Sequence, residues 1–563
     1  MSYQLIECVP NFSEGNDLNI IKQITNEIEK VEGVKLLNVD PGKATNRTVV
    51  TFVGPPEAVI NAAFLAIKKA AELIDMSKHK GEHPRMGATD VCPLIPIAGI
   101  SMEETAKYAK ILAEKVGKEL NIAVYLYENA QTNVNRKNLS VIRAGEYENF
   151  FKKINLPDWK PDYGPTEHSI KSGSTVIGAR DFLVAYNINL NTTSTRRANS
   201  IAFDVREAGR VKREGNTLTG KIVTDKEGIP VNIPGSLKSV KAIGWFIEEY
   251  GIAQISMNLT NINITPVHIA FDEVCNRAAE RGIRVTGSEL VGLMPLKAII
   301  DAGKYFLEKQ NRSTGVSEKE LIKIAVKSLG LDELAPFNPN ERIIEYLLKD
   351  DSKCRLIKMN LSEFADETAS ESPAPGGGSI AAYVGVLGIS LGTMVANLSS
   401  HKPGWDERWK EFSDLAEKGQ YFKNELLKLV DEDTNAFNKI MAAFSLPKSL
   451  EEEILFRKNA IQSATLYATE VPFKVMQLCY DSMEIIKIMA EKGNPNSITD
   501  AGVGALCARS AVMGAFLNVK INAASLTEKS FSEQLISKAN VLVVKTQQLE
   551  TEILKIVNDK IIL

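Results

Sequence analysis

Side chains that transfer protons and bind anions are concentrated in one short stretch of this 563-residue chain. Two of the five histidines, a carboxylate and two cations occupy seven consecutive residues: His79, Lys80, Gly81, Glu82, His83, Pro84 and Arg85. A histidine changes its charge near neutral pH, and a neighbouring arginine can hold an anionic substrate beside it. The stretch predicts a loop for proton transfer on an anion, and the alternative is a solvated loop without chemistry.

The same stretch also matches a zinc-peptidase pattern, because His79 to His83 spells H-x-x-E-H. Two zinc ligands at that spacing require a helix, which brings both imidazoles to one face. Gly81 weakens a helix, and Pro84 disfavours helical backbone at the residue before it. We therefore expect no metal here.

Length, charge and cysteine content narrow the class of protein. The chain is too long for one hydrophobic core, so we expect about three or four domains. The formal net charge of −3 gives no reason to expect a nucleic-acid partner. The six cysteines are scattered without a C-x-x-C pair, which suits a reducing compartment. Because the N-terminus also lacks the pattern of a secretory signal, we expect a cytoplasmic protein.

One run, residues 376–400, carries no charged side chain and is long enough to cross a membrane. Alanine, glycine and serine occupy many of its positions, and the sequence contains no second run of this kind. Small residues allow helices to approach closely, so we expect a helix buried among other helices and no membrane span. The part around Ala381 to Ala396 should be fully buried.

The first half of the chain alternates strand-like and helix-like periodicity, which predicts an α/β (α+β) fold of two subdomains with helices packed on sheets. The expected strands are residues 34–39, 48–53, 91–97, 122–127, 182–190 and 253–259, and the expected helices are residues 57–76, 102–120, 195–208 and 268–281. We place the subdomains at residues 1–179 and 180–330.

A change of pattern follows a proline-containing segment that we expect to be a linker, residues 331–352. Beyond it, strand signals nearly vanish and long amphipathic patterns follow one another: residues 405–444, 450–490, 499–523 and 529–557. We therefore expect residues 353–563 to form an all-α helical bundle.

Several motifs resemble known enzymes. The first half resembles the glutamate formimidoyltransferase family in its opening Glu7 to Gly15, in the loop Gly81 to Gly87 and in further segments: residues 40–42, 46–49, 161–165, 178–183 and 187–190. The second half is similar to the cyclodeaminase domain, through three segments: residues 364–366, 373–379 and 431–437. In this order, the motifs identify the chain as a member of the bifunctional formimidoyltransferase-cyclodeaminase family of histidine breakdown.

The resemblance implies two reactions on small molecules. The two subdomains would move a formimidoyl group between N-formimidoyl-L-glutamate and tetrahydrofolate. The helical domain would then close 5-formimidoyl-tetrahydrofolate to 5,10-methenyltetrahydrofolate and release ammonia. The resemblance further implies polyglutamated tetrahydrofolate as co-substrate, no metal, and a homo-oligomer, either a dimer or a ring of dimers. The alternatives are a transferase whose helical domain serves only assembly, and a folate-binding scaffold without turnover.

Residue roles in the transferase half follow from the matching motifs. His83 matches the family's catalytic histidine and would act as general base and acid; His79 is its rival. Both substrates carry carboxylates, so Arg47 and Arg85 are candidate binders, although either could be structural. Asp40 and Glu82 could orient His83 or bind an amino group.

The folate-binding wall would be the glycine- and serine-rich segment before the second subdomain, where backbone donors can approach the pterin. It comprises Gly164, Pro165, Thr166, Glu167, His168, Ser169, Ile170, Lys171, Ser172 and Gly173. Without the resemblance it reads as a plain connection.

In the helical half, Asp433 matches the family's acid and base, and Asp431 is the runner-up. A carboxyl group buried in a bundle has a raised pKa and can both accept and give a proton. The glycine run before Ser379 opens a helix whose N–H groups could hold a carboxylate of the folate tail. Arg457 or Lys458 could also hold the folate.

Overall fold

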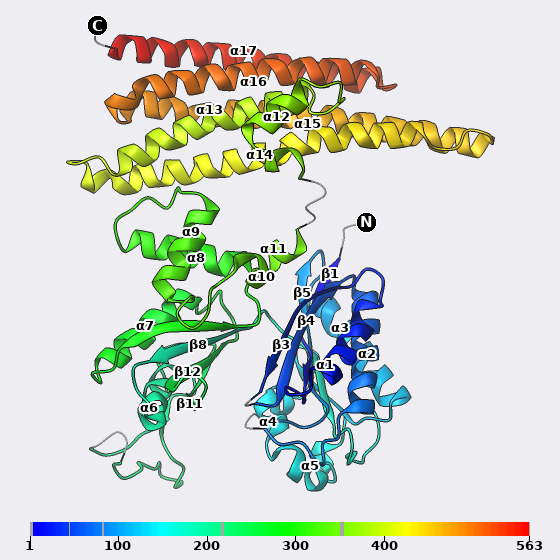
Figure 1. Cartoon of the computed structure of the whole chain (residues 1–563), viewed down its shortest axis with the longest axis vertical. Coiled ribbons are helices and arrows are strands. Elements are labelled where there is room, and N and C mark those ends of the chain that lie inside the picture. Colours follow the sequence, from blue (N-terminus) through cyan, green and yellow to red (C-terminus); the bar gives the residue numbers. More distant parts are fainter. Residues whose placement is uncertain (1–3, 44, 82–83, 216–218, 350–353, 562–563) are drawn as a thin grey trace. The chain divides into compact units, whose positions relative to one another are not determined.

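The computed structural model describes residues 4–43, 45–81, 84–215, 219–349 and 354–561. The chain divides into two compact units (Figure 1). The first comprises Met1–Asp301 with Leu329–Leu348, and the second comprises Ala302–Ser328 with Lys349–Leu563.

The first unit begins with a seven-stranded sheet in the order β1-β4-β2-β5-β7-β6, with β3 paired to β4. Its strands are β1 Leu5–Cys8, β2 Asn11–Phe12, β3 Lys35–Gly42, β4 Arg47–Gly54, β5 Thr89–Ala98, β6 Val124–Glu128 and β7 Thr175–Ala179. Strand β7 runs parallel to β5 and β6, and the remaining pairs are antiparallel.

Both faces of this sheet are covered, because successive side chains of a strand point to opposite sides. In β6, Val124 and Leu126 join the core under the helices α1 Leu18–Glu29, α2 Pro56–Leu73 and α3 Met102–Glu119 (Figure 1). Tyr125 and Tyr127 point the other way. They join the cluster formed with α4 Leu139–Arg143 and α5 Glu146–Lys153.

The second sheet of this unit is antiparallel, in the order β11-β12-β8-β13. Its strands are β8 Val184–Leu190, β11 Val240–Ile247, β12 Ile252–Leu259 and β13 Val285–Val291. One face carries buried apolar residues such as Ile188 and Ile255, and α6 Thr195–Val205 and α7 Val267–Ala279 pack against this sheet. The alternate positions carry amides, among them Asn187, Asn189 and Gln254. A separate two-stranded ribbon pairs β9 Arg210–Val211 with β10 Asn232–Ile233.

Part of the segment predicted to be a linker is built into the first unit. It forms α10 Pro339–Arg342 and α11 Ile344–Leu348, and Ile343 and Ile344 are buried. Ahead of it lie α8 Leu296–Glu308 and α9 Glu318–Leu329.

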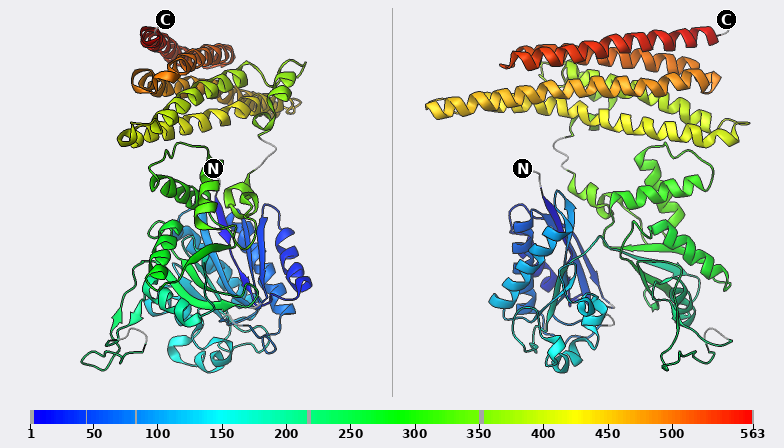
Figure 2. Two further views of the ribbon diagram at one scale, coloured as in Figure 1. Left: turned by 60° about the vertical axis from the view of Figure 1, so that its left-hand side comes forward. Right: turned by 180° about the vertical axis from the view of Figure 1, so that it is seen from behind.

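The second unit is built from long helices that run alongside one another (Figures 1 and 2). They are α13 Gly377–Ser400, α14 Trp409–Phe444, α15 Glu451–Lys492, α16 Ile498–Ala524 and α17 Lys529–Lys560, with the short α12 Leu361–Thr368 before them. Helix α13 packs against α14, α15 and α16. Its glycines make this possible, because a Cβ at Gly388 would lie 2.9 Å from the carbonyl oxygen of Gly504. The predicted fold class, an α/β transferase part followed by a helical bundle, is confirmed.

Two helices are long and apolar enough to cross a membrane, Gly377–Ser400 and Pro495–Ala524. The second is less apolar and carries Asp500, Arg509 and Lys520, so it is not a second uncharged run. Such helices are only a weak indication of a membrane, because core helices pass the same test, and the most apolar windows of these two are 61% and 50% buried. Within one chain the run around Ala381 to Ala396 is only partly buried, since Leu387 is 44% and Met394 is 38% exposed. Its full burial in an assembly stays a prediction.

Candidate active sites

His83 and Glu82, the centre of the predicted transferase site, lie outside the described residues. The residues before them are well anchored. His79 Nε2 lies 2.9 Å from the carbonyl oxygen of Asn46, and the Asn46 amide donates to the Lys80 carbonyl at 2.8 Å. Arg85 Nε donates to His79 Nδ1 at 3.3 Å, so both ring nitrogens of His79 are engaged. This geometry gives His79 a structural part in the loop.

The residues after them are held by a buried carboxylate. Asp90 accepts the backbone N–H of Met86 at 3.0 Å. It also pairs with Arg47, and with Arg143 at 2.6 Å. Asp90 is fully buried, and Arg47 is only 8% exposed. Within a low-dielectric interior a carboxylate between two guanidinium groups is a strong anchor.

Arg85 is also engaged by carboxylates of the protein. Its guanidinium pairs with Glu148 at 2.6 Å and with Glu146 at 2.9 Å, both on α5. These contacts favour the alternative that Arg47 and Arg85 are structural, because each already has a carboxylate partner inside the protein. The sequence offered no signal for Asp90, Glu146 or Glu148, whose partners are distant along the chain.

The segment predicted to bind folate lies beside this loop. Gly173 bridges to Gly87, and the backbone N–H of Ala88 donates to the Ser172 carbonyl at 2.8 Å. Gly173 has φ +67°, and a Cβ there would lie 2.6 Å from the Cα of Gly87, so this close approach requires glycine. The structure therefore brings the end of this segment and the residues after His83 together.

The members of the segment differ in what they can offer a ligand. Gly164, Thr166, Glu167, Ile170 and Lys171 are exposed, and Pro165, Ser169 and Ser172 are half-buried.

His168 is the exception, because it points into the protein. Its Nδ1 lies 2.7 Å from Ser174 Oγ, and its ring packs against Tyr147, Phe150 and Phe151. Burial lowers the pKa of His168 to about 4, so the ring is neutral at physiological pH. This environment is that of a core residue and not of a folate contact.

Asp40 lies on β3 and faces the second sheet of the same unit. Its carboxylate accepts the backbone N–H of Gly292, the residue after β13, and Arg342 and Glu289 lie nearby. Burial raises the pKa of Asp40, and the charge of Arg342 opposes that rise.

Glu7 is a buried carboxylate that the sequence analysis did not single out. It lies on β1, is 2% exposed, and belongs to the opening motif. Burial raises the pKa of Glu7 to about 7, and the charge of Arg180 opposes the rise. The strand pattern gave no sign of this burial. Ile6 and Cys8 point to the helix-covered face of the sheet, so Glu7 between them points to the other face, where a charged residue is usually exposed.

In the helical unit, Asp433 lies against the first turn of α13. Ser379 Oγ is 3.1 Å from Asp433 Oδ2 and 2.8 Å from the carbonyl oxygen of Val430. A Cβ at Gly378 would lie 2.7 Å from Asp433 Oδ2, so the glycine run creates the space for this carboxylate. Burial raises the pKa of Asp433, and hydrogen bonds from the side chain and backbone of Ser379 oppose the rise. The first turn of α13 thus receives a carboxylate of the protein itself, where we had expected one from the folate tail.

Asp431 has a different environment. Its two carboxylate oxygens accept the backbone N–H groups of Leu356 at 2.7 Å and Ile357 at 3.2 Å. Because residues two apart on a helix point to different faces, Asp431 and Asp433 cannot exchange roles by a small movement. Asp431 anchors the chain segment ahead of α12.

Arg457 is not brought together with Asp433. Its guanidinium donates to the Phe444 carbonyl at 2.9 and 3.2 Å, where α14 ends. That point lies eleven residues beyond Asp433, or roughly 16 Å along the helix. Arg457 therefore caps the end of α14.

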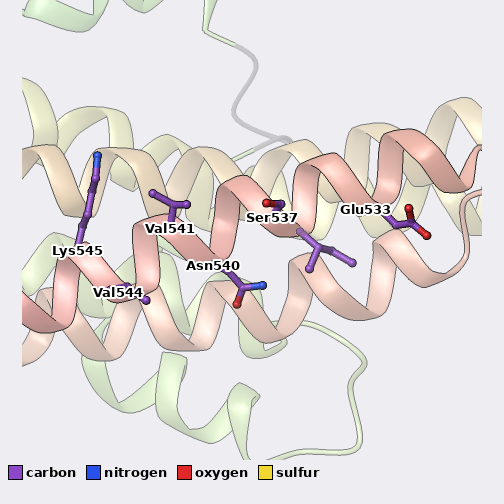
Figure 3. Close-up of a pocket in the computed structure, with 7 residues that line it drawn as sticks. Glu533, Ser537, Asn540, Val541, Val544 and Lys545 are labelled. Atoms are coloured by element: carbon purple, nitrogen blue, oxygen red, sulfur yellow. The ribbon is translucent and has the colours of Figure 1, made fainter.

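The outer surface of α17 carries a shallow hollow of about 650 Å³ (Figure 3). It is lined by Glu533, Ile536, Ser537, Asn540, Val541, Val544 and Lys545. All these residues belong to one helix and none is a candidate site residue, so the hollow is no candidate active site. Among the described residues, no group of three or more histidine, cysteine or acidic side chains is arranged to hold a metal ion.

Three family models match this chain. They are the formiminotransferase domain, N-terminal subdomain, over residues 5–180, the formiminotransferase domain over residues 185–349, and formiminotransferase-cyclodeaminase over residues 360–541. The formimidoyltransferase-cyclodeaminase of Mus musculus is 42% identical over 94% of both chains. The chain belongs to the formimidoyltransferase-cyclodeaminase family. The family predicted from the motifs is therefore confirmed, and the chain is a folate enzyme with a transferase part and a cyclodeaminase part.

Shorter relatives correspond to the separate parts of this family. A glutamate formimidoyltransferase of Thermoplasma acidophilum is 40% identical over 57% of this chain and 98% of its own length. A methenyltetrahydrofolate cyclohydrolase of Methylorubrum extorquens is 35% identical over 36% of this chain and 97% of its own length. In formimidoyltransferase-cyclodeaminases the two parts are joined in one chain.

Proposed function

We propose that the first unit transfers the formimidoyl group from N-formimidoyl-L-glutamate to tetrahydrofolate, with His83 as general base and acid. The attacking folate nitrogen loses a proton, the formimidoyl carbon becomes tetrahedral, and the glutamate nitrogen gains a proton as it leaves. One imidazole can perform both proton transfers in turn. The proposal is supported by the motif that contains His83 and by the anchoring of its flanking residues through His79 and Asp90.

The second reaction is the ring closure in the helical unit, with Asp433 as acid and base. The second folate nitrogen attacks the formimidoyl carbon and loses a proton, and ammonia gains a proton as it leaves. A carboxyl group with a raised pKa is suited to both steps, and burial raises the pKa of Asp433. Asp431 is less suited because both its oxygens hold backbone amides.

The observation that carries the bifunctional proposal is the extent of the similarity, which spans 94% of this chain and of the mouse relative. A chain with only transferase activity would need no more than the first unit, as in the relative from Thermoplasma acidophilum.

A second candidate for the helical unit is hydrolysis of methenyltetrahydrofolate, because the Methylorubrum extorquens relative is a methenyltetrahydrofolate cyclohydrolase. This reaction acts on the same ring that the cyclodeaminase reaction forms. Supplying methenyltetrahydrofolate to the purified protein separates the two candidates, since only a cyclohydrolase accelerates its loss above the spontaneous rate.

We further propose a homo-oligomer that buries apolar side chains left exposed on the helical unit. On α16 they recur at helical spacing: Val503 is 48%, Leu506 is 44%, Leu517 is 62% and Ile521 is 68% exposed. Stripes of this kind mark surfaces that are covered by a partner. A closed assembly would hold polyglutamated folate near both sites and raise the effective concentration of the intermediate at the second site.

We also propose a cytoplasmic location. It is supported by the scattered cysteines of the sequence, which form no C-x-x-C pair and suit a reducing compartment.

The experiment that tests the bifunctional proposal supplies purified protein with N-formimidoyl-L-glutamate and tetrahydrofolate. We expect the absorbance of methenyltetrahydrofolate to rise together with free ammonia. Accumulation of 5-formimidoyl-tetrahydrofolate without ammonia would mean that the protein has only transferase activity. Binding of tetrahydrofolate without turnover would mean that it is a folate-binding scaffold.

A further inference from the structure

The face of the four-stranded sheet opposite the apolar core is lined by amides and carries the carboxylate of Glu289. In one cross-strand row Ser256, Asn187 and Glu289 are direct neighbours on β12, β8 and β13. Gln254 and Asn189 occupy the next row and are fully buried. Amides buried on the face of a sheet need hydrogen-bond partners, and here they form a connected network.

Glu289 is held in this network by neutral groups. Its carboxylate accepts hydrogen bonds from Asn187 Nδ2 at 3.1 Å, Gln254 Nε2 at 3.2 Å and the Tyr250 hydroxyl at 3.3 Å. No ion pair between described residues involves Glu289, whereas Arg47 and Arg85 each pair with a carboxylate. Glu289 therefore has an orientation that is fixed by three neutral donors.

A second carboxylate approaches Glu289 from another element. Asp40 on β3 accepts the backbone N–H of Gly292, three residues beyond Glu289. Burial raises the pKa of Tyr250 to about 12, and the nearby charges of Glu289 and Asp40 add to the rise. Glu249 also adds to the rise, so three carboxylates lie near this hydroxyl group, with Arg342 beside Asp40 as a neighbouring cation. This excess of negative charge favours a further cation beside Glu289.

A donor without a partner lies on the same side of β3 as Asp40. Asn38 is two residues earlier, hence on the same face of the strand. Its buried Nδ2 has no hydrogen-bond partner among the described residues. An amide donor in this position can serve a polar ligand without breaking an existing contact.

The formimidoyl group of the proposed donor substrate has the matching chemistry. It is an amidine, which is protonated near neutral pH and presents N–H groups in one plane. This planar arrangement matches a carboxylate in the same way as the guanidinium of arginine does. We propose that Glu289, oriented by Asn187 and Gln254, binds the protonated formimidoyl group of N-formimidoyl-glutamate and selects it over free glutamate. The proposal rests on the transferase function proposed above.

The test compares the full-length protein with Glu289→Gln, which removes the charge at nearly constant shape. We expect the KM for N-formimidoyl-L-glutamate to rise on the order of tenfold to a hundredfold, because a charge-assisted bond is lost. The KM for tetrahydrofolate should stay within about twofold. Glu333→Gln is the matched control, since Glu333 is exposed and accepts a hydrogen bond from Asn189 at 2.6 Å on the same face.

A direct probe of the charge is acetamidinium, a small amidine cation, with neutral acetamide as its control. Acetamidinium should inhibit the wild-type transferase in competition with N-formimidoyl-L-glutamate, and acetamide should not. Inhibition should weaken about tenfold or more in Glu289→Gln and persist in Glu289→Asp, which keeps the charge.

The outcomes separate this inference from the function on which it rests. A wild-type protein without transferase turnover overturns the proposed function. An active protein in which Glu289→Gln leaves the substrate KM and the acetamidinium inhibition unchanged overturns the role of Glu289 alone. If Glu289→Gln does not fold, loss of acetamidinium inhibition in the folded Glu289→Asp protein would also overturn it.

Discussion

Alanine at Gly378 should disable the helical site without unfolding the helix that carries it. A Cβ there would lie 2.5 Å from Asp433 Cγ and 2.7 Å from Asp433 Oδ2. Carbon atoms in contact lie about 3.5 to 4.0 Å apart, so the carboxylate must move by about 1 Å. A displacement of that size at a reacting group lowers a rate on the order of a hundredfold.

Gly377 supplies the matched control one residue earlier in the same turn. A Cβ at Gly377 would meet only Asn518 Nδ2, at the ordinary distance of 3.6 Å. Gly377→Ala should therefore keep full activity and leave stability equal or higher, by up to about 1 kcal/mol, because alanine favours helix over glycine.

The assay follows ammonia release from supplied 5-formimidoyl-tetrahydrofolate, with thermal unfolding of each variant as a check of folding. We expect Gly378→Ala to lose cyclodeaminase activity and to keep transferase activity. Equal cyclodeaminase rates in Gly378→Ala and Gly377→Ala would refute the reasoning, because the carboxylate that matters would then not lie at the first turn of α13.

Three further predictions concern stability and assembly. The raised pKa of Glu7, about 7 against 4.5 for the free group, means that the unfolded chain loses this proton first as the pH rises. Glu7 should thus lower the free energy of unfolding by about 3 kcal/mol between pH 4.5 and 7.5. Denaturant titrations at several pH values measure this fall, and Glu7→Gln should remove it. The same fall of unfolding free energy with pH in Glu7→Gln would contradict the burial of the Glu7 carboxyl group. Arg85→Met should lower the midpoint of thermal unfolding, since the buried Arg85 guanidinium joins His79 in the loop to Glu146 and Glu148 on α5; an unchanged midpoint with a raised substrate KM would instead make Arg85 a substrate binder. Light scattering should find a closed homo-oligomer, and Leu517→Glu with Ile521→Glu on the exposed stripe of α16 should reduce its size; a monodisperse wild-type monomer with both activities would contradict the assembly.

The sequence was most informative where periodicity was long and regular. The patterns predicted at residues 405–444 and 529–557 correspond to the single helices α14 Trp409–Phe444 and α17 Lys529–Lys560, because apolar side chains recur at helical spacing over many turns. Strands β7 and β13 were not predicted, since each contains glycine, which weakens the strand signal.

The site residues show a different limit of sequence reasoning. The motif favoured Asp433 with Asp431 as runner-up, and the structure adds that the partners of Asp431 are backbone amides at residues 356 and 357. Arg47 and Arg85 were candidate substrate binders because both substrates carry carboxylates, with a structural role as the alternative. Their partners Asp90 and Glu148 are 43 and 63 residues away in the chain, so no local pattern could reveal the ion pairs.

The ratio of ammonia to glutamate released from N-formimidoyl-L-glutamate and tetrahydrofolate tests the central claim most directly. If one chain carries two separate sites, the wild-type protein should release ammonia and glutamate in equal amounts. Asp431→Asn should do the same, provided that this variant folds. It predicts glutamate without ammonia from Asp433→Asn, and neither product from His83→Ala, which should still release ammonia from supplied 5-formimidoyl-tetrahydrofolate. Ammonia from Asp433→Asn at the wild-type ratio, or glutamate from His83→Ala at the wild-type rate, would contradict the account.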